Sequence, residues 1–280
     1  MSFYRSIFSK KDNQMKYLYL ILSSITVAYA IVIIFIYFYQ RNLLYHPSEN
    51  NYQNDEIKFE YEEVNIEVEG EIELKSWLIK KDFTKLKTLL IFHGNAGDLS
   101  NRIYKLNELN KLDINILLIS WRGFNGNKGS PTEKNLYKDA YAAIKWLNKK
   151  KINNNQIILY GESLGTGVAI EMAKNRNFNS VILESPFTSI ENSAKIYYPY
   201  LPVKLLLKDK YDSISKIKMV NSPVLIMHGK KDDVVPFSMG QKLFEEANNP
   251  KHSYFTSSDD HMMEFNSELL NEIKNFIKKY

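Results

Sequence analysis

The sequence contains no cysteine. Disulfide bonds, thiolate metal sites, a cysteine nucleophile and a palmitoylation site are therefore excluded for this chain. It also lacks an internal repeat, and its net charge of +5 is concentrated near the N-terminus, where the first 41 residues hold five basic side chains and one acidic one. The remaining residues are nearly neutral, so the sequence shows no basic surface of the kind that binds nucleic acid.

Charge is absent from a stretch of 23 residues, Tyr17 to Tyr39. This length is about what a helix needs to cross a hydrocarbon layer of roughly 30 Å, and tyrosines at both ends suit the two headgroup layers. The alternatives are a cleaved signal peptide, whose apolar region is only about 7–15 residues long, and a buried core helix. We predict an uncleaved transmembrane anchor over residues 17–39, preceded by an N-terminal tail, residues 1–16.

Basic residues flank this span unequally, because four precede it and only Arg41 follows closely. The asymmetry predicts a cytoplasmic N-terminus and a globular domain on the opposite side, periplasmic or lumenal. Residues 40–55 contain Pro47 and several asparagines, which predicts a linker. The globular domain is then expected over residues 56–280, a length that one domain can fill.

Within that domain, the pattern of apolar residues changes along the chain. Segments 63–69 and 72–79 alternate apolar and polar residues about Gly70, as an antiparallel hairpin does. Continuous apolar runs follow, typical of strands covered on both faces, and stretches of helical period separate them. The runs are 88–92, 114–120, 156–160, 180–183 and 224–227, and the helical stretches are 102–111, 133–149, 164–174 and 239–247. This alternation predicts an α/β fold with a mostly parallel sheet, helices on both faces and functional groups at the carboxyl ends of the strands.

The run 156–160 is followed by Gly161-Glu162-Ser163-Leu164-Gly165 and then by a helical stretch. This order of strand, sharp turn and helix is that of a nucleophile elbow, in which flanking glycines make room for a strained serine. The pentapeptide alone is a weak pattern, and a glycine-rich turn of no function has the same composition. We take Ser163 as the candidate nucleophile because other strand ends carry suitable partners.

One such strand end is His93-Gly94-Asn95-Ala96-Gly97, which follows the run 88–92. Glycines free this backbone to turn N–H groups toward an oxyanion. We predict that the amides of Asn95 and Leu164 form an oxyanion hole. His93 precedes the serine and directly ends a strand, so we interpret it as structural.

The acid and the base should follow the serine in the chain. Asp232 and Asp233 both lie in the loop after the run 224–227, and Glu184 ends the run 180–183, so three carboxylates are candidates for the acid. Among the five histidines, only His261 lies in a loop between the last strand-like run, 252–255, and the closing helix. We predict His261 as the base.

With these residues in place, the chain resembles the α/β-hydrolase superfamily, and within it the membrane-anchored, bud-emergence-like branch of the abhydrolase-domain proteins. Two departures from the usual pattern, Asp259-Asp260 before the histidine and asparagines at positions 125 and 127, touch no candidate catalytic atom. The matching segments are 93–97 with Arg102, 121–124, 139–140, 161–165 with Gly167, 184–187, Asp232 with 235–236, His261, and 43–47 after the anchor. The resemblance implies the α/β-hydrolase fold and favours Asp232 as the acid, which makes Ser163, Asp232 and His261 a catalytic triad.

The residues therefore predict a serine hydrolase that needs no cofactor and no metal. Residues 187–222 form an insertion rich in tyrosine and leucine, which either covers an acyl pocket as a lid or only packs on the core. Three hypotheses remain. In the first, the chain is an esterase or thioesterase that acts at a membrane on lipid-like acyl groups of lipids or acylated proteins. In the second, it is a serine peptidase of the prolyl-oligopeptidase-like kind. In the third, it is a non-catalytic membrane scaffold on a hydrolase fold, for which a broken triad would be the sign.

Overall fold

Continuous apolar runs form the centre of one eight-stranded sheet in the computed structural model, which describes residues 2–48 and 56–280. The strand order is β10-β9-β8-β7-β4-β6-β3-β2, and all neighbours are parallel except β2 with β3 and β3 with β6. The strands are β2 (Glu62–Glu69), β3 (Ile72–Ile79), β4 (Thr88–Phe92), β6 (Asn115–Ile119), β7 (Ile157–Glu162), β8 (Ser180–Glu184), β9 (Val224–Gly229) and β10 (Lys251–Thr256). The predicted α/β-hydrolase fold, with its N-terminal antiparallel hairpin, is confirmed.

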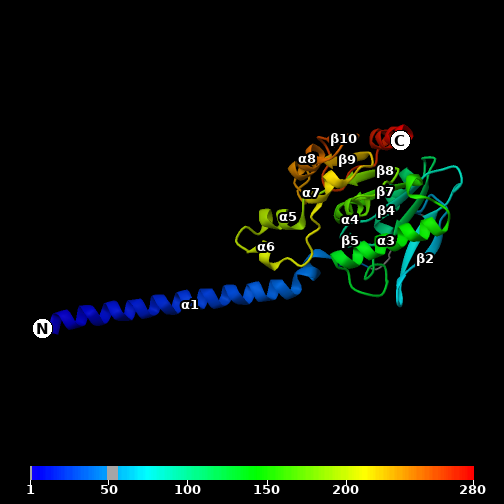
Figure 1. Cartoon of the computed structure of the whole chain (residues 1–280). Coiled ribbons are helices and arrows are strands. Elements are labelled where there is room, and N and C mark those ends of the chain that lie inside the picture. Colours follow the sequence, from blue (N-terminus) through cyan, green and yellow to red (C-terminus); the bar gives the residue numbers. More distant parts are fainter. Residues whose placement is uncertain (1, 49–55) are drawn as a thin grey trace.

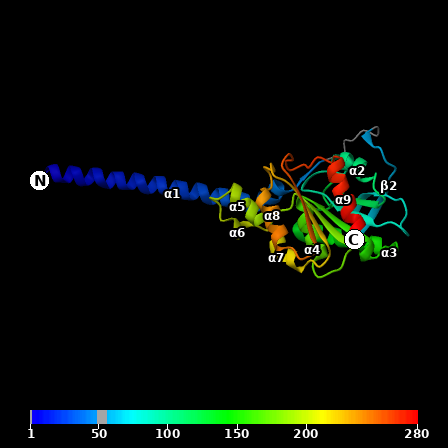
Figure 2. The same ribbon diagram turned by 90° about the horizontal axis from the view of Figure 1, so that it is seen from above.

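The central strands are mostly apolar because helices cover both faces of the sheet. Every residue of β4, β6 and β7 is buried, whereas β2 at the edge alternates in burial. One core lies under α3 (Glu133–Lys149), α4 (Leu164–Ala173) and α8 (Phe237–Glu246), and a second lies under α2 (Ile103–Leu109) and α9 (Ser267–Lys279). Figure 2 shows α4 and α9 on opposite sides of the strands.

Two of these helices begin where polar side chains cap them. Thr132 has extended backbone and accepts a hydrogen bond from the amide of Asn135, which starts α3. Asn266 accepts bonds from the amides of Glu268 and Leu269 at the start of α9. Such caps satisfy amides that have no acceptor within the first helical turn. Short 3-10 turns at Ser100–Arg102 and Asn154–Gln156 complete the connections before α2 and β7.

The N-terminal helix α1 (Ser2–Leu44) projects away from the sheet (Figure 1). Its part Met15–Leu44 is long and apolar enough to cross a membrane, and its most apolar window is not buried at all. An apolar helix at this place is either a membrane anchor or a signal sequence, and its length agrees with the predicted span.

The predicted linker, residues 40–55, is wrong in part. Residues 40–44 continue α1, and His46–Pro47 forms a short strand, β1, parallel to β5 (Ala96–Gly97); residues 49–55 lie outside the described residues. The amide of His46 donates to the carbonyl of Asn95 at 2.8 Å. The partner strand β5 is distant in the sequence, so no sequence pattern indicated this pairing and Pro47 indicated only a loop. Pro47 has no N–H to give, which suits a short strand at an edge.

The insertion between β8 and β9 contains three short helices: α5 (Ile190–Tyr197), α6 (Val203–Leu206) and α7 (Ser213–Lys216), followed by a 3-10 turn at Ile217–Met219. Figure 1 shows α5 and α6 outside the sheet, on the side where α1 reaches the domain. The side chain of Ser189 caps α5 by accepting from the amide of Asn192. The insertion therefore stands between the core and the apolar helix.

Candidate active site

Ser163 stands on a sharp turn between β7 and α4, with backbone angles φ 49° and ψ −115°. A positive φ is unfavourable for a residue other than glycine, so the backbone at Ser163 is strained. Both flanking glycines are required by close contacts. A Cβ at Gly161 would lie 2.5 Å from the Cα of Thr166, and one at Gly165 would lie 1.9 Å from the carbonyl oxygen of Phe92. The pentapeptide is thus a nucleophile elbow in geometry as well as in sequence.

The structure brings Ser163, His261 and Asp232 together from three separate strand ends. The Oγ of Ser163 lies 3.0 Å from Nε2 of His261, and Nδ1 of the same ring lies 2.8 Å from Oδ2 of Asp232. The other carboxylate oxygen of Asp232 accepts from the amides of Val234 and Val235 at 2.9 and 2.7 Å. With Nδ1–H donating to the carboxylate, Nε2 is free to accept the serine proton, which is the arrangement of nucleophile, base and orienting acid.

The electrostatics of the three side chains suit these positions. Burial alone raises the pKa of Asp232, but hydrogen bonds from His228 and His261 outweigh it and hold that pKa well below its ordinary value. Burial lowers the pKa of His261, while the hydrogen bond and the charge of Asp232 raise it, and the net direction is upward. Asp232 is therefore ionised, and its charge favours the protonated form of His261.

Asp232 also contacts a second histidine, His228, which the sequence did not single out. His228 is fully buried, and its Nε2 lies 3.0 Å from both Oδ2 of Asp232 and the carbonyl oxygen of Val235. Two acceptors on one ring nitrogen mean that this nitrogen carries the hydrogen and donates. A Cβ at Gly240 would lie 2.2 Å from Nδ1 of His228, so α8 packs directly on the ring. In the sequence, the signal that could have indicated this contact is that His228 lies at the end of β9, four residues before Asp232.

The alternative residues occupy other roles. Asp233 is exposed, and its carbonyl oxygen accepts from the hydroxyl of Tyr197 at 2.7 Å. His93 is buried, with Nδ1 2.8 Å from the carbonyl oxygen of Gly94; burial, with the nearby charge of Arg102, lowers the pKa of His93 to about 3. His93 is therefore neutral and structural, as its place at a strand end indicated.

Glu184, the third candidate acid, belongs to a buried ionic cluster behind the elbow. Nζ of Lys105 lies 2.5 Å from a carboxylate oxygen of Glu162 and 2.5 Å from one of Glu184, and Nη2 of Arg102 lies 2.5 Å from Glu162. The hydroxyl of Tyr160 also donates to Glu184. Burial raises the pKa of Glu184, whereas the two cations outweigh burial at Glu162 and keep its pKa well below the ordinary value. The sequence missed Lys105 because a lysine on a helix is normally solvated.

This cluster also joins the nucleophile elbow to the loop that follows β4. Glu162 directly precedes Ser163, and its carboxylate accepts from the amide of Gly94 at 3.3 Å. The segment after β4 is thereby held against the elbow. Buried ion pairs of this kind fix a geometry even where they add little net stability.

Asn95 and Leu164, the residues predicted to form an oxyanion hole, line the same cavity as Ser163. Leu164 is the first residue of α4, so its amide has no acceptor within the helix. The side chain of Asn95 donates to the carbonyl oxygen of Leu44 at 2.7 Å, which ties this loop to the end of α1. The cavity that they share with Ser163 has a volume of about 320 Å³. Over the described residues, no group of three or more histidine or carboxylate side chains is arranged to hold a metal ion.

Sheet order and elbow define the class of the protein as an α/β-hydrolase. A model of the prolyl oligopeptidase family matches residues 124–279. The chain is 33% identical over 219 residues to protein bem46 of Schizosaccharomyces pombe, with 72% of this chain and 73% of that protein covered. It is 34% identical over 197 residues to alpha/beta hydrolase domain-containing protein 17B of Homo sapiens, with 69% and 66% covered.

A solved structure, the esterase Pf2001 of Pyrococcus furiosus, superposes with a TM-score of 0.69 at 20% identity and covers 85% of this chain and 97% of its own. At that identity the likeness concerns the fold. The chain thus belongs to the prolyl oligopeptidase family of α/β-hydrolases, in the branch of bem46, and is a hydrolase.

Proposed function

We propose that this protein is a membrane-anchored serine hydrolase that cleaves carboxylic esters or thioesters of lipid-like acyl groups. The observation that carries the proposal is the hydrogen-bonded chain from Ser163 through His261 to Asp232 at a nucleophile elbow. Nucleophile, base and orienting acid within hydrogen-bond reach of one another are the signature of covalent acyl transfer. A non-catalytic scaffold would have no reason to keep this geometry.

The reaction follows from the positions of these atoms. As Oγ of Ser163 attacks the substrate carbonyl, Nε2 of His261 takes the hydroxyl proton, and the amides of Asn95 and Leu164 bind the oxyanion. Collapse of the tetrahedral intermediate breaks the bond to the leaving alcohol or thiol, which receives the proton from His261. Water, deprotonated by His261, then attacks the acyl-enzyme and releases the acid and the free serine.

The surroundings of Ser163 favour an apolar acyl group. Its cavity is lined by Leu43, Leu44, Phe187, Ile190 and Val235 among others, and the nearby helix α1 is apolar enough for a membrane. Apolar walls with a few polar groups at the reacting centre are typical of sites for lipid-like substrates. On this proposal the N-terminus is cytoplasmic, the catalytic domain lies on the opposite side, and the substrate is an acyl lipid or an acylated protein.

A second function, a serine peptidase of the prolyl-oligopeptidase-like kind, is favoured by one observation, the family match over residues 124–279. The same three side chains would attack a peptide carbonyl, and His261 would protonate an amine. Hydrolysis of peptide amides in place of acyl esters would identify this function.

The test is labelling of the full-length protein in membranes with a fluorophosphonate. Wild type should be labelled, Ser163→Ala should lose the label and about 10⁶-fold in kcat, and Ser253→Ala, an exposed serine on β10, should behave as wild type. Acyl esters, acyl thioesters and peptide amides are then compared on the labelled protein. Labelling that survives Ser163→Ala would refute the assignment, and no labelling of wild type would favour the scaffold.

A further inference from the structure

A second cavity, of about 160 Å³, lies between the end of α1 and the α5–α6 segment of the insertion. Its lining is mostly apolar, with Gln40, Arg41 and Asp209 as the polar residues. From α1 come Ile36, Leu43 and Leu44, and from the insertion come Ala194, Leu201 and Leu206. A cavity lined in this way takes hydrocarbon in preference to water or polar ligands.

This cavity adjoins the one that holds Ser163, and the two share part of their lining. Leu43, Leu44, Ile190, Ala194 and Tyr198 line both. Taken together, and here called the channel, the two cavities extend from Ser163 to Ile36 on α1. Eight residues of helix separate Ile36 from Leu44, which corresponds to about 12 Å along the helix axis.

Polar contacts fix the end of α1 as one wall of this channel. Gln40 donates from Nε2 to the carbonyl oxygen of Leu206 at 2.9 Å and accepts from the amide of Lys208 at 2.8 Å. Arg41 pairs with Asp209, with Nε 2.8 Å from Oδ2. Together with the bond from Asn95 to the carbonyl of Leu44, these contacts join the apolar helix both to the insertion and to the predicted oxyanion loop. A helix that only tethered the domain would need none of them.

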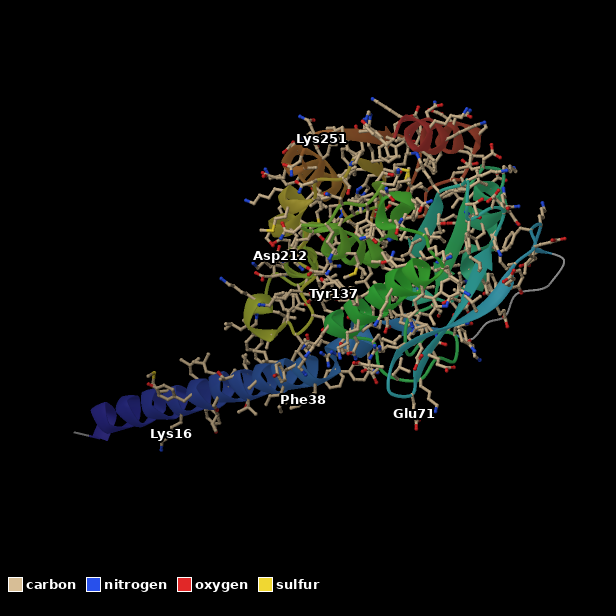
Figure 3. All side chains as sticks on the ribbon, turned by 45° about the vertical axis from the view of Figure 1, so that its right-hand side comes forward. Lys16, Phe38, Glu71, Tyr137, Asp212 and Lys251 are labelled. Carbon is tan, nitrogen blue, oxygen red and sulfur yellow. The ribbon has the colours of Figure 1, made fainter. Side chains whose placement is uncertain are left out.

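The channel lies at the domain end of the apolar helix α1. The 30 residues of Met15–Leu44 span about 45 Å as a helix, some 15 Å more than a typical hydrocarbon layer. The predicted span ends at residue 39, so Leu43 and Leu44 lie beyond it and Ile36 lies about one helical turn inside it. Figure 3 shows Phe38 close to the domain and Lys16 far out along the helix.

The tip of the insertion lies beside the apolar helix and exposes apolar side chains. Leu205 and Tyr200 are 82% and 66% exposed, and the hydroxyl of Tyr29, within the apolar span, donates to the carbonyl oxygen of Tyr200 at 2.7 Å. Nζ of Lys208 lies 4.1 Å from the centre of the Tyr37 ring. Exposed apolar and aromatic side chains beside a basic one are typical of a surface at the membrane interface.

We propose that this channel holds the hydrocarbon chain of the substrate, with the carbonyl at Ser163 and the tail along α1 toward Ile36, and that α1 is a wall of the substrate site. The substrate passes from the bilayer into the channel without its chain crossing water. This inference rests on the proposed function and adds that the anchor and the insertion together set the acyl-chain length.

The first test measures chain-length preference with the full-length protein in phospholipid nanodiscs. In wild type, kcat/KM for acyl esters should rise about fourfold per methylene until the channel is full. Leu206→Trp, which fills the channel, should lower the ratio of octanoyl to acetyl activity at least tenfold. Leu205→Trp is the matched control, because this neighbouring leucine is exposed and does not line the channel, and its ratio should stay within twofold of wild type.

The second test locates the chain directly. An alkyl fluorophosphonate that carries a diazirine at its tail is attached to Ser163 and photolysed. The expected crosslinks fall on α1 between Ile36 and Leu44 and on α6. Labelling of Ser163 with no crosslink to α1, or an unchanged octanoyl to acetyl ratio in Leu206→Trp that still labels, would overturn the channel alone. Absence of Ser163-dependent labelling in wild type would overturn the proposed function and the channel with it.

Discussion

Replacing Lys105 by methionine tests the buried ionic cluster behind the elbow. The lysine side chain is completely buried, with its Nζ 2.5 Å from Glu162 and 2.5 Å from Glu184. Methionine keeps most of the side-chain volume and removes the charge, so two carboxylates are left with Arg102 as their remaining cation in the cluster. Removing one partner of a buried ion pair costs about 3–5 kcal/mol of unfolding free energy. For a chain of this size that corresponds to a fall in Tm on the order of 6–20 °C.

The loss in Lys105→Met should also depend on pH. Burial already raises the pKa of Glu184, and the charge of Lys105 opposes that rise, so in the variant the pKa of Glu184 moves further upward. A carboxyl whose folded pKa lies above its unfolded value binds its proton more strongly in the folded state. Its contribution to stability is present at low pH and is lost as the pH rises through the folded pKa. The deficit of Lys105→Met against wild type should therefore be larger at pH 8 than at pH 5.5.

Thermal unfolding of the full-length protein in detergent, followed by circular dichroism at both pH values, measures this. Lys111→Met is the control, because its side chain is 61% exposed and pairs with Glu108 at the surface. That pair should be worth less than about 1 kcal/mol. Equal losses in the two variants, or a larger deficit for Lys105→Met at acid pH, would refute the reasoning about the cluster.

Three further predictions concern the active site. Asp232→Asn should lower kcat on the order of 10⁴-fold and move the acid limb of the kcat/KM profile to lower pH, because the carboxylate raises the pKa of His261; a limb that stays in place would contradict this pairing. His93→Gln should leave that limb where it is in wild type, since the pKa of His93 is about 3 and the ring is neutral throughout; a shifted limb would show that His93 takes part in the titration. Gly165→Ala should abolish fluorophosphonate labelling or folding, because its Cβ would lie 1.9 Å from the carbonyl oxygen of Phe92; soluble, fully labelled protein would be inconsistent with the elbow geometry.

The order of strands and helices was readable from the chain because burial on both faces imposes continuous apolar runs. Segment 88–92 was predicted with the bounds of β4, and segment 133–149 with those of α3. The elbow was readable for a related reason, since only glycine fits at Gly161 and Gly165. The observed strand ends differ from the predicted ones where a residue outside the apolar run continues the strand, as Glu162 does at the end of β7.

Contacts between distant segments were not readable. Asp232 and Asp233 are adjacent, and the residues alone left both open; the structure places Asp232 against His261 and leaves Asp233 exposed. His228 and Lys105 looked like an ordinary strand residue and an ordinary helix residue, and their importance comes from carboxylates that only the folded sheet brings near.

The sequence by itself determined the α/β class, the strained serine and the long apolar helix, because each depends on local composition, spacing or glycine sterics. The tertiary structure decided which acid faces the histidine, and it decided what the end of α1 contacts. Gln40 and Arg41 appeared in the sequence as the start of a linker, yet they bind the insertion and make the helix part of the pocket beside Ser163. Hydrogen bonds and ion pairs between segments more than 150 residues apart leave no periodic trace in the chain, and so only the folded structure reveals them.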